Sequence, residues 1–339
     1  MRRLRTLIVG FGKIGAGYAD DPVMAKHFEF ATHAQVLSLH PAFVWDACVD
    51  PSSDALKQAR ERWGMQIAVP RIEDLPDGYA PDVVVIATPP STRALIVEAF
   101  PHAKAFLVEK PMGLDAAEGE ALVRHCAQRG VLLQVMLWRR ADSGLRALSE
   151  GGLARLVGPI QGITCAYGNG LRNNGVHMID LVRMLGGEVA SVRALAPWRE
   201  SCGPLPGDTD IPFHLTLANG VPVSFLPLDF SYYRENSIEI WGREGRLSIR
   251  QEGLTAKLHR RVANRAMHSE YEIDGDVAEA VFTAPGRAFY DLYNNLANAI
   301  ADQTALWSSG TSALRSESVV DAVWQSMQAG SELMSLQQP

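Results

Sequence analysis

Short apolar runs alternate with amphipathic segments over the first 138 residues of the chain. The apolar runs are rich in Val, Ile and Leu, which is typical of strands covered on both faces. They occupy Leu4–Val9, Phe43–Val49, Gln66–Val69, Val83–Thr88, Ala105–Val108 and Leu132–Leu137. Helices are expected at His33–Leu39, Ser53–Trp63, Thr92–Phe100 and Asp115–Gln128. Because this alternation joins parallel strands through crossover helices, it predicts an open, doubly wound α/β sheet.

The pattern changes after about Arg139, where strands of the antiparallel type are expected. Apolar and polar residues alternate over 213–217 and again over 221–225. Asn219-Gly220 between them favours the positive φ angles of a type I′ hairpin turn. A second pair of strands is expected at Ser237–Trp241 and Arg246–Ile249, and a further strand near Ile160–Ala166.

Two domains follow from this change of pattern, and a chain of 339 residues accommodates two. Residues 1–138 form the α/β domain. Residues 139–339 form an α+β domain with a mostly antiparallel open sheet. Helices near Arg287–Ala301 and Ser312–Leu336 close the chain, and the C-terminal helix is expected to pack back on the first domain.

Composition and charge exclude several classes of protein. The net charge is −6 and no basic stripe is present, so a nucleic-acid surface is not expected. No apolar stretch reaches 18 residues, so no membrane span is expected. The scattered cysteines Cys48, Cys126, Cys165 and Cys202 are typical of reduced thiols, which predicts a cytoplasmic protein.

A glycine-rich turn, Gly10-Phe11-Gly12-Lys13-Ile14-Gly15, follows the first expected strand directly. GxGxxG at this place lets backbone N–H groups approach the pyrophosphate of a dinucleotide in a Rossmann domain. A glycine-rich turn without a ligand is the ordinary alternative. The regular strand–helix alternation that follows favours the cofactor site.

Asp50 ends the second expected strand, where a carboxylate accepts hydrogen bonds from ribose hydroxyls and repels a 2′-phosphate. NAD is therefore favoured over NADP. Asp50 lies 35 residues after Gly15, whereas about 20 is usual. The excess falls in Ala16–Thr32, which contains Pro22, and an inserted loop is expected to delay the first helix to His33.

Two further segments end strands at the expected ligand edge of the sheet. Ala87-Thr88-Pro89-Pro90 ends the fourth strand and Glu109-Lys110-Pro111 ends the fifth. Lys110 is placed to direct an ammonium group towards a nicotinamide ring. The ordinary alternative is a surface lysine that pairs with Glu109.

A helix that carries a histidine is expected in the second domain. Met178, Leu181, Val182 and Leu185 form one apolar face, with Gly186-Gly187 as its C-cap. Asn173, His177 and Asp180 follow at i, i+4 and i+7 on another face, so the helix presents a candidate base. A buried histidine paired with Asp180 is the alternative. The spacing is poor for a metal, and none is expected.

These residues, in this order, resemble the Gfo/Idh/MocA family of oxidoreductases over nearly the whole chain. The match consists of the turn Gly10–Gly15, Asp50, Ala87–Pro90, Glu109–Pro111 and Gly175–Asp180. The resemblance implies that Lys110 and His177 are the catalytic pair beside the nicotinamide. It also implies a homodimer or homotetramer.

The resemblance also bears on the substrate. Inositol dehydrogenases of the family carry Asp four residues before the histidine, and this chain carries Asn173. That is more like the branch acting on nucleotide-linked sugars in surface-polysaccharide biosynthesis. The expected function is hydride transfer between NAD and a secondary alcohol of such a sugar. His177 acts as general base, Lys110 stabilises the alkoxide, Asn173 orients the substrate and Asp180 favours the charged imidazole, which the helix N-terminus opposes.

Two alternatives remain open from sequence. Some members of the family are NAD-dependent glycosidases that oxidise their substrate transiently. A non-catalytic NAD-binding regulator is the other alternative, because a fold alone does not establish chemistry.

Overall fold

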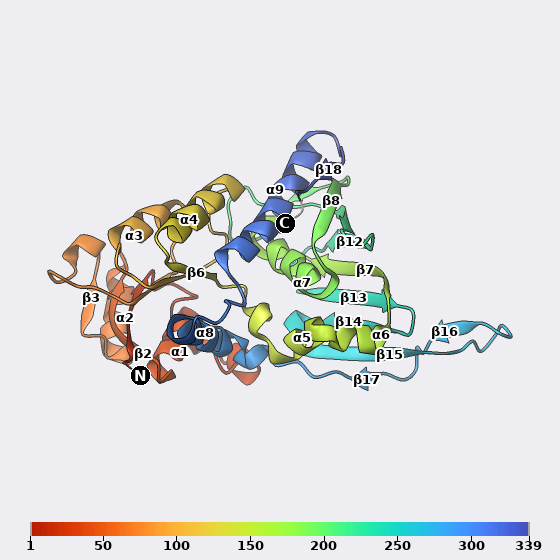
Figure 1. Ribbon diagram of the computed structural model, residues 1–339, viewed down its shortest axis with the longest axis horizontal. Coiled ribbons are helices and arrows are strands. Elements are labelled where there is room, and N and C mark those ends of the chain that lie inside the picture. The colour runs from red at the N-terminus through yellow and green to blue at the C-terminus, as the bar shows by residue number, and fades with distance from the viewer. Residues whose placement is uncertain (1, 338–339) are drawn as a thin grey trace. The chain divides into compact units, whose positions relative to one another are not determined.

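The computed structural model describes residues 2–337 and divides the chain into two compact units (Figure 1). The first unit consists of the chain up to Ala141 together with Gly286–Leu314. The second consists of Asp142–Pro285 and the chain from Arg315 onward. Each unit therefore contains two separate segments of sequence. No described helix combines the length and apolar character that a membrane crossing needs.

The first unit is built on a six-stranded parallel sheet with the order β3-β2-β1-β4-β5-β6. This is the order of a Rossmann sheet, so the predicted doubly wound fold is confirmed. The strands are β1 (Leu4–Val9), β2 (Phe43–Val49), β3 (Ile67–Val69), β4 (Val83–Ile86), β5 (Ala105–Val108) and β6 (Leu132–Val135). The strands β4 and β6 each end two residues before the expected position, because the chain turns away at the ligand edge.

Helices cover both faces of this sheet and produce two hydrophobic cores. The helices are α1 (His33–Leu39), α2 (Ser53–Trp63), α3 (Arg93–Ala99), α4 (Ala116–Gln128) and α8 (Pro285–Asp302). Ile8 packs in the core beneath α1, α2 and α8, whereas Leu7 and Val9 pack in the core beneath α3 and α4. Alternate side chains of one strand thus enter different cores, which explains the continuous apolar runs.

The expected insertion is confirmed, and it interrupts the first helix. The carbonyls of Ile14 and Gly15 accept hydrogen bonds from the N–H groups of His33 and Ala34, at 3.2 and 2.9 Å. An uninterrupted α-helix would use residues 18 and 19 for these bonds. His33 therefore occupies the helical place of residue 18, and fifteen residues are looped out. Without them, Asp50 follows Gly15 by the usual interval of about 20.

The looped-out segment packs on α8. The ring of Phe30 lies 4.8 Å from that of Tyr290, and the Phe30 N–H donates to the carbonyl of Gly286 at 3.2 Å. Two short 3₁₀ turns, Gly17–Asp20 and Met24–Lys26, shape the rest of the segment. The insertion is therefore an ordered part of the first unit.

The second unit contains a ten-stranded sheet that is mostly antiparallel, as predicted. Its main order is β16-β15-β14-β13-β7-β12-β11-β8-β18, and β17 pairs with β15. Only β7 and β12 run parallel among these pairs. The strands are β7 (Ile160–Tyr167), β8 (Val189–Ala194), β11 (Phe213–Leu217), β12 (Pro222–Pro227), β13 (Ser237–Gly242), β14 (Gly245–Arg250), β15 (Thr255–Ala263), β16 (Tyr271–Ile273), β17 (Glu279–Ala280) and β18 (Met334–Ser335). A separate ribbon pairs β9 (Arg199–Glu200) with β10 (Thr209–Asp210).

Helices cover one face of this sheet. They are α5 (Ser143–Ala147), α6 (Leu153–Val157), α7 (Val176–Gly186) and α9 (Gly310–Gln328), which begins in the first unit. The other face carries polar and exposed side chains such as His214, Thr216 and Leu226. The predicted hairpin forms at Asn219-Gly220. Of these two residues only Gly220 has a positive φ, +84°, so the turn is not of the expected type I′.

The structure corrects the predicted length of the last helix, which was expected near Ser312–Leu336. α9 ends at Gln328 rather than Leu336, because Gly330 adopts a φ of +70° and the chain leaves the helix. Met334 and Ser335 then pair with β8 as β18. The apolar residues that suggested a longer helix belong to this short strand.

We predict that excising Tyr18–Thr32 preserves the fold. The deletion joins Gly17 to His33 and restores an uninterrupted helical hydrogen-bond pattern. Loss of the buried Phe30 side chain should lower the free energy of unfolding by only about 1.5–3 kcal/mol. Urea denaturation followed by circular dichroism measures this. A loss of cooperative unfolding would contradict the proposed register.

Candidate active site

The glycines of the turn after β1 meet different geometric requirements. Gly10 has a φ of +93°, and a Cβ there would lie 2.6 Å from the carbonyl oxygen of Ala87. A Cβ on Gly15 would lie 2.8 Å from the Gly10 oxygen. The protein itself thus requires these two glycines. No heavy atom of the described residues lies within 4 Å of the corresponding point on Gly12, which is exposed. That open space beside the backbone suits the approach of a pyrophosphate.

Asp50 joins the end of β2 to this turn. Its Oδ2 accepts the N–H of Phe11 at 2.6 Å, and its Oδ1 accepts the N–H of Ser52 at 2.8 Å. Each carboxylate oxygen retains a second lone pair, so bonds from ribose hydroxyls are compatible with this arrangement. The Phe11 side chain is buried with its ring 5.7 Å from that of Trp45. Phe11 therefore holds the turn in place.

The predicted cofactor residues of the first unit share one edge of its sheet. β1, β4 and β5 are parallel neighbours, so Gly10–Gly15, Ala87–Pro90 and Glu109–Lys110 all follow their carboxyl ends. The strand order reverses between β1 and β4, which is where open α/β sheets bind ligands. The Thr92 hydroxyl donates to Thr88 Oγ1 at 2.7 Å and fixes this part of the edge.

Glu109 contacts the resumed first helix. Its Oε1 lies 3.3 Å from Nε2 of His33, and Nδ1 of His33 lies 2.7 Å from the hydroxyl of Tyr293 in α8. His33 and Tyr293 are fully buried, and the Glu109 side chain is 12% exposed. Burial raises the pKa of Tyr293 well above its usual value, and the charge of Glu109 raises it further. Tyr293 is therefore a neutral phenol in the folded protein.

His177 is placed in the second unit on an almost completely buried helix. Of the eleven residues of α7, only His177 and Met184 are not buried. The expected apolar face packs in the core, and Gly187 caps the helix with a φ of +111°. The helix therefore presents His177 at its first turn while its other side chains are held rigidly.

Asn173 precedes His177 in a turn that a buried carboxylate holds. The N–H of Arg172 donates to Asp208 Oδ1 at 3.1 Å, and that of Asn173 donates to Asp208 Oδ2 at 2.9 Å. Burial raises the pKa of Asp208 above its ordinary value, although the backbone donors act in the opposite direction. The Asn173 amide donates to the carbonyl of Asn169 at 3.1 Å. Asp208 thus fixes the backbone from which the Asn173 side chain projects.

Asp180 belongs to a buried network, which differs from the expected polar face. Its Oδ1 accepts the hydroxyl of Ser316 at 2.9 Å and lies 3.4 Å from Nη1 of Arg183. Arg183 also pairs with Glu188 at 2.8 Å. Asp180 is 2% exposed, whereas His177 is half-buried. Its contacts stabilise the helix.

Sequence reasoning missed several residues that shape these sites. His33, Tyr293, Asp208 and the paired amides Asn174 and Asn236 are all buried and hydrogen-bonded across long stretches of sequence. No local spacing links them, because their partners come together only in the fold. One signal in the sequence could have indicated these buried contacts. It is a polar residue at a position where an apolar one is expected, such as His33 at the start of α1.

The fold and this edge define a dinucleotide-binding oxidoreductase. Residues 4–137 match the sequence profile of an oxidoreductase family with an NAD-binding Rossmann fold, and residues 164–248 match the Gfo/Idh/MocA C-terminal domain. Together the two profiles cover more than half of the chain. The chain belongs to the Gfo/Idh/MocA family, as the resemblance implied.

Comparisons with individual proteins agree with this assignment. The chain is 28% identical over 206 residues to inositol 2-dehydrogenase of Rhizobium meliloti (strain 1021), covering 56% of this chain and 59% of that protein. It is 29% identical over 84 residues to trans-1,2-dihydrobenzene-1,2-diol dehydrogenase of Sus scrofa, a quarter of each chain. The matches span less than two thirds of either relative. The WlbA dehydrogenase of Bordetella pertussis has the same fold, with a TM-score of 0.74 and 19% identity over the full length of both chains.

We predict that alanine substitutions separate the two kinds of glycine. Gly12→Ala fills the exposed space, so the affinity for NAD should fall about tenfold or more while the melting temperature stays unchanged. Gly10→Ala imposes a strained φ and a clash, and should lower the free energy of unfolding by about 1–3 kcal/mol. Calorimetric titration and thermal melts measure the two effects. Unchanged NAD affinity in Gly12→Ala would contradict the pyrophosphate assignment.

Proposed function

We propose that this protein is an NAD-dependent dehydrogenase acting on a secondary alcohol of a sugar or nucleotide-linked sugar. The observation that carries the proposal is His177, presented at the first turn of a helix whose other residues, apart from Met184, are buried. A histidine held in this way suits a general base, because its unperturbed pKa lies near neutrality. Membership of an oxidoreductase family with an NAD-binding domain supports the reaction class.

The cofactor proposal rests on the edge of the first unit. The open space at Gly12 suits the pyrophosphate of a dinucleotide, and the carboxylate of Asp50 suits its ribose. The strand end at Ala87–Pro90 suits the nicotinamide side. NAD supplies a hydride acceptor when it is bound. The Asp50 charge favours NAD over NADP by repelling a 2′-phosphate.

The proposed chemistry assigns a separate task to each side chain. His177 accepts the proton of the substrate hydroxyl. Lys110, which follows β5 at the ligand edge, donates a hydrogen bond to the oxygen on which negative charge develops. Asn173 orients the substrate without exchanging a proton, because an amide does not titrate near neutral pH. Asp180 acts indirectly by holding α7 through its hydrogen bond with Ser316 of α9.

The relatives and Asn173 support the proposed substrate class. The WlbA dehydrogenase was crystallised with NADH and UDP-GlcNAcA, and the curated relative from Rhizobium meliloti acts on inositol. Both ligands present adjacent hydroxyl groups on a six-membered ring. The neutral Asn173 favours the nucleotide-linked sugar, as in surface-polysaccharide biosynthesis. The cytoplasmic location inferred from the cysteines is compatible with such a substrate.

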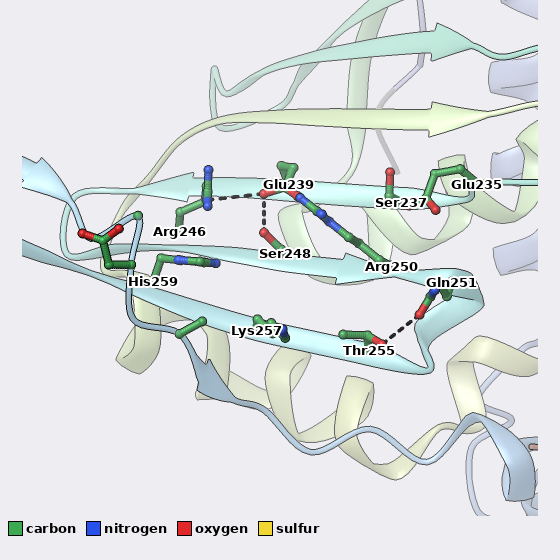
Figure 2. Close-up of a pocket in the computed structure, with 13 residues that line it drawn as sticks. Glu235, Ser237, Glu239, Arg246, Ser248, Arg250, Gln251, Thr255, Lys257 and His259 are labelled. Atoms are coloured by element: carbon green, nitrogen blue, oxygen red, sulfur yellow. Dashed lines mark hydrogen bonds and ion pairs between the residues drawn. The ribbon is translucent and has the colours of Figure 1, made fainter.

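A homodimer or homotetramer is part of the proposal. The open face of the second unit's sheet includes a hollow of about 970 Å³ on β13, β14 and β15 (Figure 2). Glu239 lies at its centre and pairs with Arg250 at 2.8 Å and Arg246 at 3.5 Å. Ile238 and Ile240 on the same strand point to the opposite, helix-covered face. We propose that this open face contacts a second copy of the chain.

The catalytic assignment predicts large losses of turnover. Lys110→Met should lower kcat by about 10²–10³-fold, because it removes the donor to the developing alkoxide, while NAD affinity changes little. His177→Asn should lower kcat by about 10²–10⁴-fold. Production of NADH, followed by its absorbance with a panel of sugars and nucleotide sugars, measures both. Lys104→Met, at the opposite end of β5, is the matched control. Near-normal turnover in Lys110→Met would defeat the assignment.

The preference for NAD is predicted to depend on the charge of Asp50. Asp50→Asn keeps one acceptor oxygen for the turn but removes the repulsion of a 2′-phosphate. The ratio of NADPH to NADH affinity should shift towards NADPH by about tenfold, measured by fluorescence titration. Asp54→Asn removes an exposed charge four residues later and should leave the ratio unchanged. An unchanged ratio in Asp50→Asn would contradict the proposed ribose contact.

A further inference from the structure

We propose that Asn236 is a positioning residue, which holds the turn that directs Asn173 towards the substrate. This inference rests on the proposed function, in which Asn173 orients the substrate. Asn236 directly precedes β13, whereas Asn173 lies in the turn Leu171–Gly175 that leads into α7. Both belong to the second unit, and they are joined through Asn174, whose buried side chain is hydrogen-bonded to Asn236.

Asn174 and Asn236 form a reciprocal pair of buried amides. The Asn174 amide donates to Oδ1 of Asn236 at 2.8 Å, and the Asn236 amide donates to Oδ1 of Asn174 at 3.3 Å. Each amide nitrogen also donates to a second acceptor, which is the carbonyl of Gly168 at 2.8 Å for Asn174 and Oε1 of Glu252 at 2.7 Å for Asn236. Both amides thus use both of their N–H donors. A buried polar pair that is satisfied in this way has one preferred orientation.

The amide pair holds the residues on which the Asn173 side chain depends. The Asn173 amide donates to the carbonyl of Asn169 at 3.1 Å. Asn174 directly follows Asn173, and Asn169 directly follows Gly168, whose carbonyl accepts the Asn174 amide. Both partners in the Asn173–Asn169 bond are therefore neighbours in sequence of residues that the pair holds. Loss of Asn236 would loosen both at once.

The backbone of this segment adopts a conformation that its surroundings must maintain. Asn169 has a φ of +60° and Gly170 has a φ of +90°. A non-glycine residue in the left-handed region persists where neighbouring groups fix its conformation. Asp208 supplies one set of bonds, to the backbone N–H groups of the turn, and Asn174 supplies another through its side chain. Asn236 is the partner that orients this second set.

The segment that joins β12 to β13 anchors Asn236. Oε1 of Glu252, which accepts the Asn236 amide, also accepts Nε of Arg234 at 2.8 Å. The ring of Phe230 packs against Gly168, where a Cβ would lie 2.5 Å from its Cδ1 atom. This segment therefore contacts the backbone before the turn directly, and it contacts the turn itself through Asn236.

A buried asparagine of the first unit provides the matched control. Asn295 in α8 is 3% exposed, as is Asn236. Its amide donates to the carbonyl of Ala305 at 2.9 Å, and its Oδ1 accepts the N–H of Trp307 at 2.8 Å. Asn236→Ala and Asn295→Ala each remove a buried, hydrogen-bonded amide. Only Asn236→Ala removes bonds that hold the turn.

The first test measures hydrogen exchange in the full-length protein without substrate. The N–H groups of Asn174 and Gly175 donate to the carbonyl of Gly170 at 2.9 and 3.0 Å, so their exchange reports opening of the turn. Asn236→Ala should speed this exchange at least about tenfold, and Asn295→Ala should leave it unchanged. Peptide mass spectrometry measures both rates. Equal exchange in the two variants would overturn the proposal.

A second substitution keeps the test decisive if Asn236→Ala does not fold. Asn236→Asp preserves the shape of the side chain and the oxygen that accepts from Asn174. It loses at least one of the two donated bonds, because a carboxyl group carries one proton or none. Exchange of the turn should therefore change in the same direction by at least about threefold. Wild-type exchange in Asn236→Asp would contradict the proposal.

The second test asks whether Asn236 acts through Asn173. Asn236→Ala should lower kcat/KM for the sugar about five- to tenfold, while the dissociation constant for NAD changes less than about twofold. The stoichiometry of NAD binding should stay unchanged, whereas partial unfolding would reduce it. In an Asn173→Ala background the same change should lower kcat/KM less than about twofold, because the orientation is already lost. A full five- to tenfold loss in that background would contradict the proposal.

Failure of the proposed function gives a different result. Absence of turnover by the wild-type protein with every sugar would defeat the proposed function. The hydrogen-exchange comparison needs neither sugar nor NAD, so it decides independently whether Asn236 holds the turn.

Discussion

The pair of hydrogen bonds from His33 and Ala34 to the carbonyls of Ile14 and Gly15 determines much of the first unit. These bonds continue the first helix across an insertion of fifteen residues. They hold the glycine-rich turn at the end of β1. When the looped-out residues are left out of the count, Asp50 follows Gly15 by the usual interval of about 20 residues. They also bring the His33 side chain beside Glu109. One register therefore positions both the cofactor edge and the buried contacts of His33 with Tyr293 and Glu109.

The second unit uses a different constraint to present its reactive group. α7 is enclosed by the sheet and by neighbouring helices, and the hydrogen bonds that join Asp180 and Arg183 to Ser316 of α9 fix its rotation. An enclosed helix cannot turn without exposing apolar side chains or separating Asp180 and Arg183 from Ser316 of α9, both of which are costly. His177 consequently has a fixed direction. Asp208 gives the preceding turn the same rigidity by accepting two of its backbone N–H groups.

The fold was largely readable from the sequence because periodicity and turn chemistry are local. The strand runs of the first domain, the insertion before His33 and the hairpin at Asn219-Gly220 were all predicted within a few residues. The end of α9 was missed, because Met334 continues a helical pattern that only the pairing of β18 with β8 resolves. Among the site residues, the glycines and Asp50 follow from spacing. Sequence spacing did not indicate that Asp180 is buried, where its carboxylate contacts Ser316 and Arg183.

The buried contacts of the site lay beyond sequence reasoning for the same physical reason. His33 and Tyr293 are 260 residues apart, and a hydrogen bond between them requires α8 to return to the first unit. Nothing in either local segment marks the pairing. Asp208 likewise acts on a turn that precedes it by about 35 residues. Such residues become interpretable only when the fold has placed their partners.

The proposed hydride transfer from a sugar carbon to NAD can be followed directly with an isotope. The wild-type protein would be incubated with NAD and sugars that carry deuterium on their secondary carbinol carbons, and the nicotinamide product analysed by mass spectrometry. We expect NADH that is one mass unit heavier and a ketone on the sugar. Sugar cleavage with no deuterated NADH, or no reaction with any sugar despite tight NAD binding, would contradict it.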